Sequence, residues 1–289
     1  MSRRRLALGI VLVVAILSAI VLTTVPGLRD QLGTVLRAVH RRQITLTHRA
    51  PRALRVDVVR SYPHDPGAFT QGLLVDGPLL YESTGLYGQS SVRRVDLQTG
   101  RVLSSAALPG AFFGEGLAMS SGQLIQLTWK EGIAFVYDPR SLERRERIAY
   151  AGEGWGLCFD GRALVMSDGS DRLTFRDPES FAVQRTVDVT QQGLPLPRLN
   201  ELECVGDSVY ANVWHTDLIV RIDSASGRVV ERIDASGLLT PEERRAADVL
   251  NGIAYDPADA TFLVTGKLWP KLFKVRFTPA ATASPGDTR

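Results

Sequence analysis

Five similar segments follow one another in this chain, and the repeat constrains the fold more than any other feature. The segments begin with QGL at 71–73, EGL at 115–117, WGL at 155–157, ELE at 201–203 and NGI at 251–253. Their first residues are 44, 40, 46 and 50 positions apart. Short apolar stretches and turn residues follow each head, with no sustained helical period. Four short strands in a repeat of about 45 residues are typical of a β-propeller, so the sequence predicts five blades.

The last repeat lacks a fourth strand, and a segment before the first repeat can supply it. The fifth repeat ends near Phe277 after three strands, whereas residues 55–60 (RVDVVR) resemble the outer strands of the other repeats. Pairing this segment with the last blade would close the ring and remove an exposed edge. We therefore predict an all-β, five-bladed β-propeller domain over residues 55–278, closed by an N-terminal strand and followed by a disordered tail at 279–289.

An apolar, charge-free run of 23 residues, 6–28, follows a short basic flank at residues 1–5. As a helix it would measure about 34 Å, enough to cross a hydrocarbon core of about 30 Å. The run is longer than a signal-peptide core, and no clear small-x-small cleavage site follows it. We therefore favour one N-terminal transmembrane helix, a signal anchor, over a cleaved signal peptide. Residues 29–54 form a basic linker, read either as an amphipathic helix on lipid or as a solvated helix.

The flanking charges do not decide the orientation of this segment, because arginines lie on both sides. Large domains cross a membrane largely regardless of flanking charge. We therefore place the propeller outside the cytoplasm, in the periplasm or the extracellular space, and as a secreted protein if the segment is cleaved.

The charge distribution and the few metal-binding residues exclude several classes of function. Residues 1–60 hold 11 Lys and Arg against 2 Asp and Glu, whereas the rest of the chain holds 23 against 29. A mildly acidic body argues against nucleic-acid binding. Four scattered histidines and two cysteines do not match a zinc-hydrolase or four-cysteine zinc pattern. Cys158 and Cys204 occupy equivalent points of the third and fourth repeats; we favour two buried thiols over a disulfide.

Equivalent positions of the repeats gather unusual residues. The heads are Gln71, Glu115, Trp155, Glu201 and Asn251, and the ends of the second strands are Gly85, Trp129, Gly169, Trp214 and Lys267. Phe113 and Asn200 lie beside two of the heads. Taken singly, a tryptophan is more often a packing residue and a Glu or Lys more often a solvated one, but the shared placement favours a site. A Glu surrounded by aromatic rings would have its pKa raised by desolvation, which suits proton transfer near neutral pH.

At these residues the chain resembles the plant-type and bacterial glutaminyl-peptide cyclotransferases. The matching stretches run in order through residues 60–277. They are FTQGL (69–73), YESTGLYG (81–88), FGEGL (113–117), TWK (128–130), GWGL (154–157), NELE (200–203), ANVW (211–214), LNGI (250–253) and TGKLWP (265–270).

This resemblance implies a five-bladed propeller enzyme that converts N-terminal glutamine to pyroglutamate and ammonia. It implies that Glu115 is the general acid and base, with Lys267 and Asn200 in polar catalytic roles. The substrate-binding wall would be Phe69, Gln71, Phe113, Trp129, Trp155 and Trp214. No metal or other cofactor is required for catalysis, although some family members hold a structural calcium in the central channel. The partner is a peptide or protein with N-terminal glutamine, the anchor contacts a membrane, and we expect a monomer.

Two other functions stay open at this point. A non-enzymatic propeller that binds peptides or proteins would need no single acid among aromatic rings. A calcium-dependent lactonase-type propeller would need several oxygen ligands around one ion. Glu115, Asn200, Glu201 and Asn251 could supply some of these.

Overall fold

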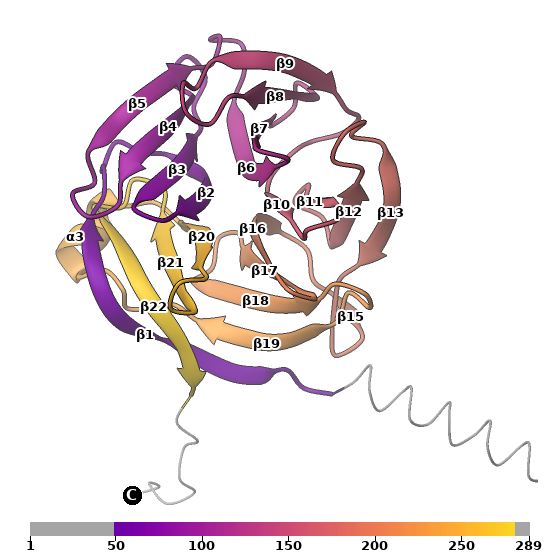
Figure 1. Ribbon diagram of the computed structural model, residues 1–289. Coiled ribbons are helices and arrows are strands. Elements are labelled where there is room, and N and C mark those ends of the chain that lie inside the picture. The colour runs from indigo at the N-terminus through magenta and orange to yellow at the C-terminus, as the bar shows by residue number, and fades with distance from the viewer. Residues whose placement is uncertain (1–48, 281–289) are drawn as a thin grey trace, which may run out of the picture. The chain divides into compact units, whose positions relative to one another are not determined.

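The computed structural model describes residues 49–280, which contain 22 β-strands and one short helix, α3 (Pro241–Ala246). Twenty of the strands form five antiparallel groups of four around a common centre (Figure 1). In each group the first strand of the repeat lies innermost, and the last lies at the rim. The predicted all-β fold is therefore confirmed, and its arrangement is propeller-like, so each group is called a blade below.

The bounds of the strands follow the repeats. Blade 1 contains β2 (Thr70–Asp76), β3 (Leu79–Thr84), β4 (Ser91–Asp96) and β5 (Val102–Ala107). Blade 2 contains β6 (Gly114–Ser120), β7 (Gln123–Thr128), β8 (Ile133–Tyr137) and β9 (Arg144–Ala149). Blade 3 contains β10 (Leu157–Phe159), β11 (Leu164–Met166), β12 (Arg172–Arg176) and β13 (Val183–Asp188). Blade 4 contains β16 (Leu199–Val205), β17 (Ser208–Val213), β18 (Leu218–Asp223) and β19 (Val229–Asp234).

Blade 5 combines the two ends of the domain. It contains β20 (Leu250–Asp256), β21 (Thr261–Gly266), β22 (Lys271–Pro279) and β1 (Arg52–Pro63). A small hairpin of β14 (Thr190–Gln191) and β15 (Leu194–Pro195) lies between blades 3 and 4 in the sequence.

Strand β1 closes the ring, as the incomplete last repeat predicts. It pairs antiparallel with β22 from Leu54 to Pro63, and parallel with β19 from Arg52 to Arg55. Blades 4 and 5 thereby join into one eight-stranded sheet. The strand is longer than the predicted residues 55–60, because residues 52–54 also pair with β19 of blade 4 and residues 61–63 continue the pairing with β22.

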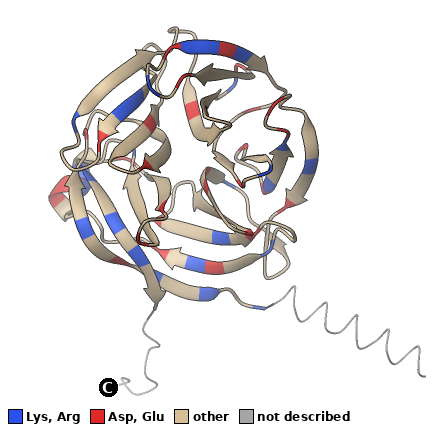
Figure 2. Ribbon diagram, in the orientation of Figure 1, with Lys and Arg blue, Asp and Glu red and all other residues tan. Residues whose placement is uncertain are grey.

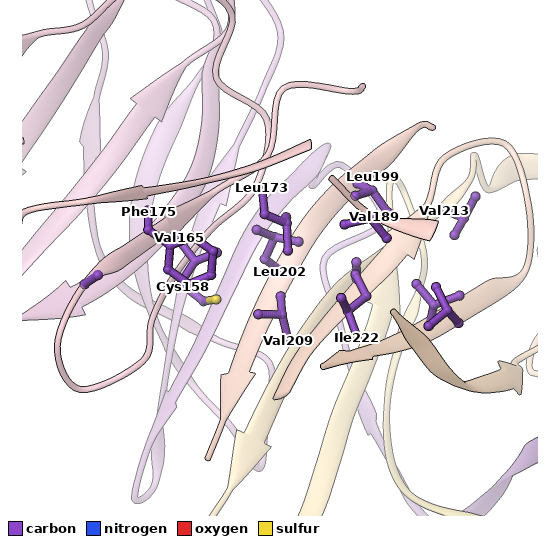
Figure 3. Packing of buried hydrophobic residues seen from close by; sticks show 14 residues of the cluster. Cys158, Val165, Leu173, Phe175, Val189, Leu199, Leu202, Val209, Val213 and Ile222 are labelled. Carbon is purple, nitrogen blue, oxygen red and sulfur yellow. The ribbon is translucent and has the colours of Figure 1, made fainter. Parts of the chain in front are cut away.

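Apolar side chains fill the spaces between blades. The middle strands are buried on both faces, as in β17, where all six residues are buried. Outer strands such as β9 (RRERIA) are largely exposed, and Lys and Arg lie along outer strands such as β1 and β9 (Figure 2). The packing between blades 3 and 4 is shown in Figure 3, with Val165, Leu173, Phe175, Leu202, Val209 and Ile222 in one cluster. This packing holds the innermost strands, and therefore the repeat heads, in fixed positions.

The two cysteines form a disulfide, so our preference for two buried thiols is wrong. Cys158 on β10 and Cys204 on β16 are bonded, with their Cα atoms 5.5 Å apart. The innermost strands of neighbouring blades run side by side, so equivalent positions in consecutive repeats come within bonding distance. The bond closes a loop across 46 positions of sequence, which would stabilise the fold by about 4 kcal/mol.

The predicted basic flank at 1–5, the transmembrane helix at 6–28 and most of the linker lie outside the described residues, as does nearly all of the predicted tail. Within residues 49–280, no helix is both long enough and apolar enough to cross a membrane.

Candidate active site

A shared backbone irregularity presents the repeat heads to the centre of the ring. The pairing of the first two strands shifts register between Thr70 and Gly72, between Gly114 and Leu117, between Leu199 and Leu202, and between Leu250 and Ile253. Gln71, Glu115, Asn200, Glu201 and Asn251 lie within these shifts. A β-bulge re-aims a side chain away from the regular alternation, so the same device recurs in four blades.

A glycine follows four of the heads, and in three of the four it allows neighbouring innermost strands to approach closely. A Cβ atom at Gly72 would lie 2.5 Å from the backbone nitrogen of Leu117, and one at Gly116 would lie 2.5 Å from that of Leu157. Such distances exclude any side chain. The recurring glycine in the repeat is therefore explained by packing around the centre.

All nine site residues predicted from the sequence surround one cavity of about 190 Å³. The lining residues are Phe69, Gln71, Phe113, Glu115, Trp129, Trp155, Asn200, Trp214 and Lys267. They come from all five blades and from the loops next to the innermost strands. The structure brings these residues together, while their individual roles stay predictions.

Glu115 is the acid inside this cavity. Its side chain is buried, and its Oε1 accepts a hydrogen bond from Gln71 Nε2 at 2.9 Å. Burial raises the pKa of Glu115 well above its ordinary value; Lys267 opposes this rise, and Glu131 and Glu153 add to it. A carboxyl group with a raised pKa can both accept and donate a proton near neutral pH.

Lys267 is the buried cation of the cavity. It follows β21, and its Nζ lies 4.7 Å from the centre of the Phe69 ring, a cation–π contact. Burial lowers the pKa of Lys267, and the nearby carboxylates of Glu115 and Asp248 oppose this effect. The backbone at Leu268 has a positive φ of 60°, and its N–H donates to Ala68 O at 2.7 Å. This turn ties the lysine loop to the loop that carries Phe69.

Asn200 presents an unused hydrogen-bonding group. Its side-chain oxygen is buried and has no hydrogen-bond partner within residues 49–280. Its backbone oxygen accepts from Ser167 Oγ at 2.6 Å, which fixes this part of β16. Buried polar atoms are rarely left unpaired, so this oxygen is suited to a group of the bound substrate.

The aromatic walls meet edge to face. Ring centres are 6.2 Å apart for Phe69 and Phe113, 5.6 Å for Phe113 and Trp129, and 5.2 Å for Trp155 and Trp214. Two glycines at equivalent positions make room for these rings. A Cβ atom at Gly85 would lie 2.3 Å from the Phe113 ring, and one at Gly169 would lie 2.6 Å from Trp155. The variation between glycine and tryptophan at this repeat position thus shapes the cavity.

The two remaining heads, Glu201 and Asn251, form hydrogen bonds within the fold instead of lining the cavity. Glu201 is fully buried, with its two oxygens accepting from Leu73 N at 3.3 Å and from Ile253 N at 2.7 Å. Asn251 Nδ2 donates to Gln71 Oε1 at 3.1 Å and to Thr70 O at 3.0 Å. Asn251 therefore fixes the Gln71 side chain. The position of Asn251 among the repeat heads could have suggested this contact.

Three further groups near the site were not assigned from the sequence. Glu153 Oε2 accepts from the indole nitrogens of Trp129 and Trp155 at 2.8 and 3.0 Å. Glu131 accepts from the hydroxyl of Tyr87 at 2.8 Å. The sequence did contain a signal for Glu153: it stands two residues before a head, as the wall residues Phe69 and Phe113 do.

The structural calcium in the channel stays a prediction, and several described side chains that could bind it are engaged elsewhere. Calcium takes six to eight oxygen ligands, whereas both oxygens of Glu201 already accept backbone N–H groups. Asn212 Oδ1 likewise accepts from Gly252 N at 3.0 Å. Within residues 49–280 there is no group of three His, Cys, Asp or Glu side chains able to hold a metal ion.

Comparisons with known proteins agree on one family. The sequence model of the glutamine cyclotransferase family matches residues 32–277. A glutaminyl-peptide cyclotransferase of Arabidopsis thaliana is 42% identical over 246 residues, which cover 83% of this chain and 76% of the relative. The crystal structure of Myxococcus xanthus glutaminyl cyclase matches with a TM-score of 0.72 and 40% identity, over 80% of this chain and 99% of that chain.

Proposed function

The chain belongs to the glutamine cyclotransferase family and is a glutaminyl-peptide cyclotransferase, and from this premise we propose that Glu115 carries the proton that the reaction must move. The observation behind the proposal is the burial of Glu115 in an aromatic cavity. Among the described residues only the Gln71 side chain donates to its carboxylate. The two other functions considered from the sequence, a binding-only propeller and a calcium-dependent lactonase, find no support in the comparisons.

The cavity holds the glutamine side chain of the substrate in position for an intramolecular reaction. Its small volume and aromatic walls suit one flat carboxamide, and the rest of the peptide stays outside. The α-amine nitrogen attacks the side-chain carbonyl carbon and forms a C–N bond in a five-membered ring. Fixing the two groups near each other supplies a large part of the rate.

Glu115 moves one proton during this reaction. Its carboxylate accepts a proton from the attacking amine and then donates a proton to the leaving nitrogen. The original C–N bond breaks, ammonia departs, and Glu115 returns to its starting state. The raised pKa of Glu115 makes both transfers accessible near neutral pH.

Lys267 and Asn200 stabilise the charge that develops on the carbonyl oxygen. Lys267 supplies a buried cation, and the amide nitrogen of Asn200 supplies a donor; such groups are effective where water is excluded. The unpartnered Asn200 oxygen accepts an N–H of the substrate amine. Gln71, held by Asn251, keeps the Glu115 carboxylate in place.

The test is ammonia release from a glutamine-initiated dipeptide by the full chain. We expect Glu115→Gln to lower kcat by about 10²–10⁴-fold with the fold intact. The control Glu146→Gln changes an exposed carboxylate on β9 and should keep wild-type activity. No step of the proposal uses a metal, so activity should survive EDTA. Wild-type activity in Glu115→Gln, or loss of activity in EDTA, would contradict the proposal.

We also propose that residues 6–28 anchor the enzyme with the catalytic domain outside the cytoplasm. The long charge-free run supports the anchor, and the Cys158–Cys204 disulfide supports an oxidising compartment. Membrane fractionation after carbonate washing would check the anchor. Protease treatment of intact cells would check the side, and N-terminal sequencing would separate an anchor from a cleaved signal peptide.

A further inference from the structure

One carboxylate oxygen holds two of the tryptophans that wall the cavity. Glu153 Oε2 accepts from Trp129 Nε1 at 2.8 Å and from Trp155 Nε1 at 3.0 Å. Trp129 follows β7 of blade 2 and Trp155 precedes β10 of blade 3. The carboxylate therefore connects cavity residues of two neighbouring blades.

The hydrogen bonds to Glu153 join two groups of aromatic rings that do not contact each other. Edge-to-face contacts join Phe69, Phe113 and Trp129 on one side, and Trp155 and Trp214 on the other. In the part of the chain that the structure describes, no ring contact joins Trp129 to Trp155. The backbone joins the two parts, since Gly154 N donates to Trp129 O at 2.8 Å, but their side chains are linked through the two hydrogen bonds to Glu153.

The repeat shows that Glu153 occupies a wall position. Phe69 and Phe113 stand two residues before their heads and line the cavity. Glu153 stands at the same place in the third repeat, directly before Gly154, whose missing side chain leaves room for the Tyr150 hydroxyl. In blade 3 a carboxylate thus takes the place of a phenyl ring and orients the wall instead of forming it.

We infer that Glu153 is a positioning residue for the cyclisation, which fixes Trp129 and Trp155 in the orientation that binds the substrate carboxamide. The inference rests on the proposed function, because it assumes that this cavity binds the glutamine side chain. Hydrogen bonds to an ionised acceptor are stronger than those between neutral groups. Side chains ordered before binding lose less freedom when the substrate arrives.

The charge of Glu153 offers a second readout. It adds to the rise in the pKa of Glu115, so its removal should lower that pKa. The charged and titratable groups that act on or face Glu115 are Lys267, Glu131, Glu153, Tyr87 and Tyr150. A residue that only supported the fold would leave the pH profile of the reaction unchanged.

The experiment measures ammonia release against dipeptide concentration and pH for the full chain, Glu153→Ala and Glu153→Gln, with Glu146→Gln as the matched control. We expect Glu153→Ala to raise KM about tenfold, as for the loss of one charge-assisted hydrogen bond, with kcat lowered less than about threefold. Glu153→Gln keeps an oxygen acceptor, so its KM should stay within about threefold of wild type. The acidic limb of its kcat profile should move to lower pH.

A folded Glu153→Ala protein with KM within about twofold of wild type would overturn the inference. If that variant does not fold, Trp155→Phe provides a test in the same direction, because it keeps an aromatic ring and removes the N–H donor together with part of the indole. An unchanged KM in Trp155→Phe would then overturn the inference. If the wild-type chain releases no ammonia, the proposed function fails; if only Glu115→Gln loses activity while the Glu153 variants match wild type, the proposed function stands and this inference fails.

Discussion

Glu115 and Glu201 occupy the same place in two repeats, yet they serve different purposes. Both are repeat heads, both are buried, and burial raises the pKa of each well above its ordinary value. Glu201 accepts backbone N–H groups from β2 and β20, the innermost strands of blades 1 and 5. Within residues 49–280, Glu115 accepts only from the Gln71 side chain, and it faces the cavity. The comparison teaches that hydrogen-bond partners, more than burial or pKa, distinguish the structural acid Glu201 from the acid that we propose for catalysis.

The largest expected effect on stability is in Glu201→Ala. This change leaves two buried backbone N–H groups without an acceptor and creates a cavity, so we expect it to lower the free energy of unfolding by about 3–5 kcal/mol. Ammonia release per folded molecule should fall far less than in Glu115→Gln. Chemical denaturation and the ammonia assay together check this prediction. An unchanged stability would remove the distinction between the two glutamates.

The pH dependence of the rate should follow the titration of the substrate amine that reacts in the cavity. The attacking amine must be neutral, and its pKa is about 7.7–8.0, so kcat/KM should rise about 40-fold between pH 6 and pH 8. Glu203→Gln, a change near Glu201 and away from the cavity lining, should leave the shape of this profile unchanged. A profile that is flat from about pH 5 to 9 would contradict the mechanism.

Part of the pH dependence of stability should come from the titration of Glu203, on the innermost strand β16. Burial raises the pKa of Glu203 to about 8, although Tyr255 N donates to it at 3.2 Å. The folded state then holds a proton that the unfolded state releases above its ordinary pKa, so the free energy of unfolding falls as pH rises toward 8. Because the side chain is only partly buried, the slope should stay below about 1.4 kcal/mol per pH unit. Glu203→Gln should flatten it, as urea unfolding at pH 5 and pH 8 would measure.

The smallest expected effect is that of Glu115→Gln on stability. Glu115→Gln removes a buried ionisable group and leaves no backbone donor unpaired, so we expect a change in unfolding free energy below about 1 kcal/mol. The inactive variant should therefore unfold at nearly the wild-type denaturant concentration. A loss of several kcal/mol would show that Glu115 also holds the fold together.

The repeat predicted the blades, the closing strand and eight of the nine cavity residues, because equivalent positions of a repeated unit occupy equivalent places around one centre. The ninth, Phe69, followed only from the family resemblance. Glu115, Trp155 and Lys267 could be grouped on this basis without any knowledge of their contacts. The division between Glu115 and Glu201 could not be predicted in this way, because it depends on which neighbouring N–H groups approach each carboxylate.

Two other features show where the repeat argument stops. The disulfide was not expected, because cysteines are often buried as free thiols, although Cys158 and Cys204 do sit at equivalent points of adjacent innermost strands. Glu153 was not assigned because its residue type differs from Phe69 and Phe113 at the same repeat position. In both cases the position in the repeat indicated the contact that the structure shows.

The closure of the ring by β1 has a consequence for synthesis of the chain. Strand β1 leaves the ribosome before any blade. Of its two partners, β22 is the last strand to be made and β19 belongs to the fourth blade. Until those partners arrive, β1 has no ladder to join, and such distant pairing slows folding. The circle is therefore completed only after nearly the whole chain has been made, so a nascent chain that stops before β22 holds four blades and an open seam.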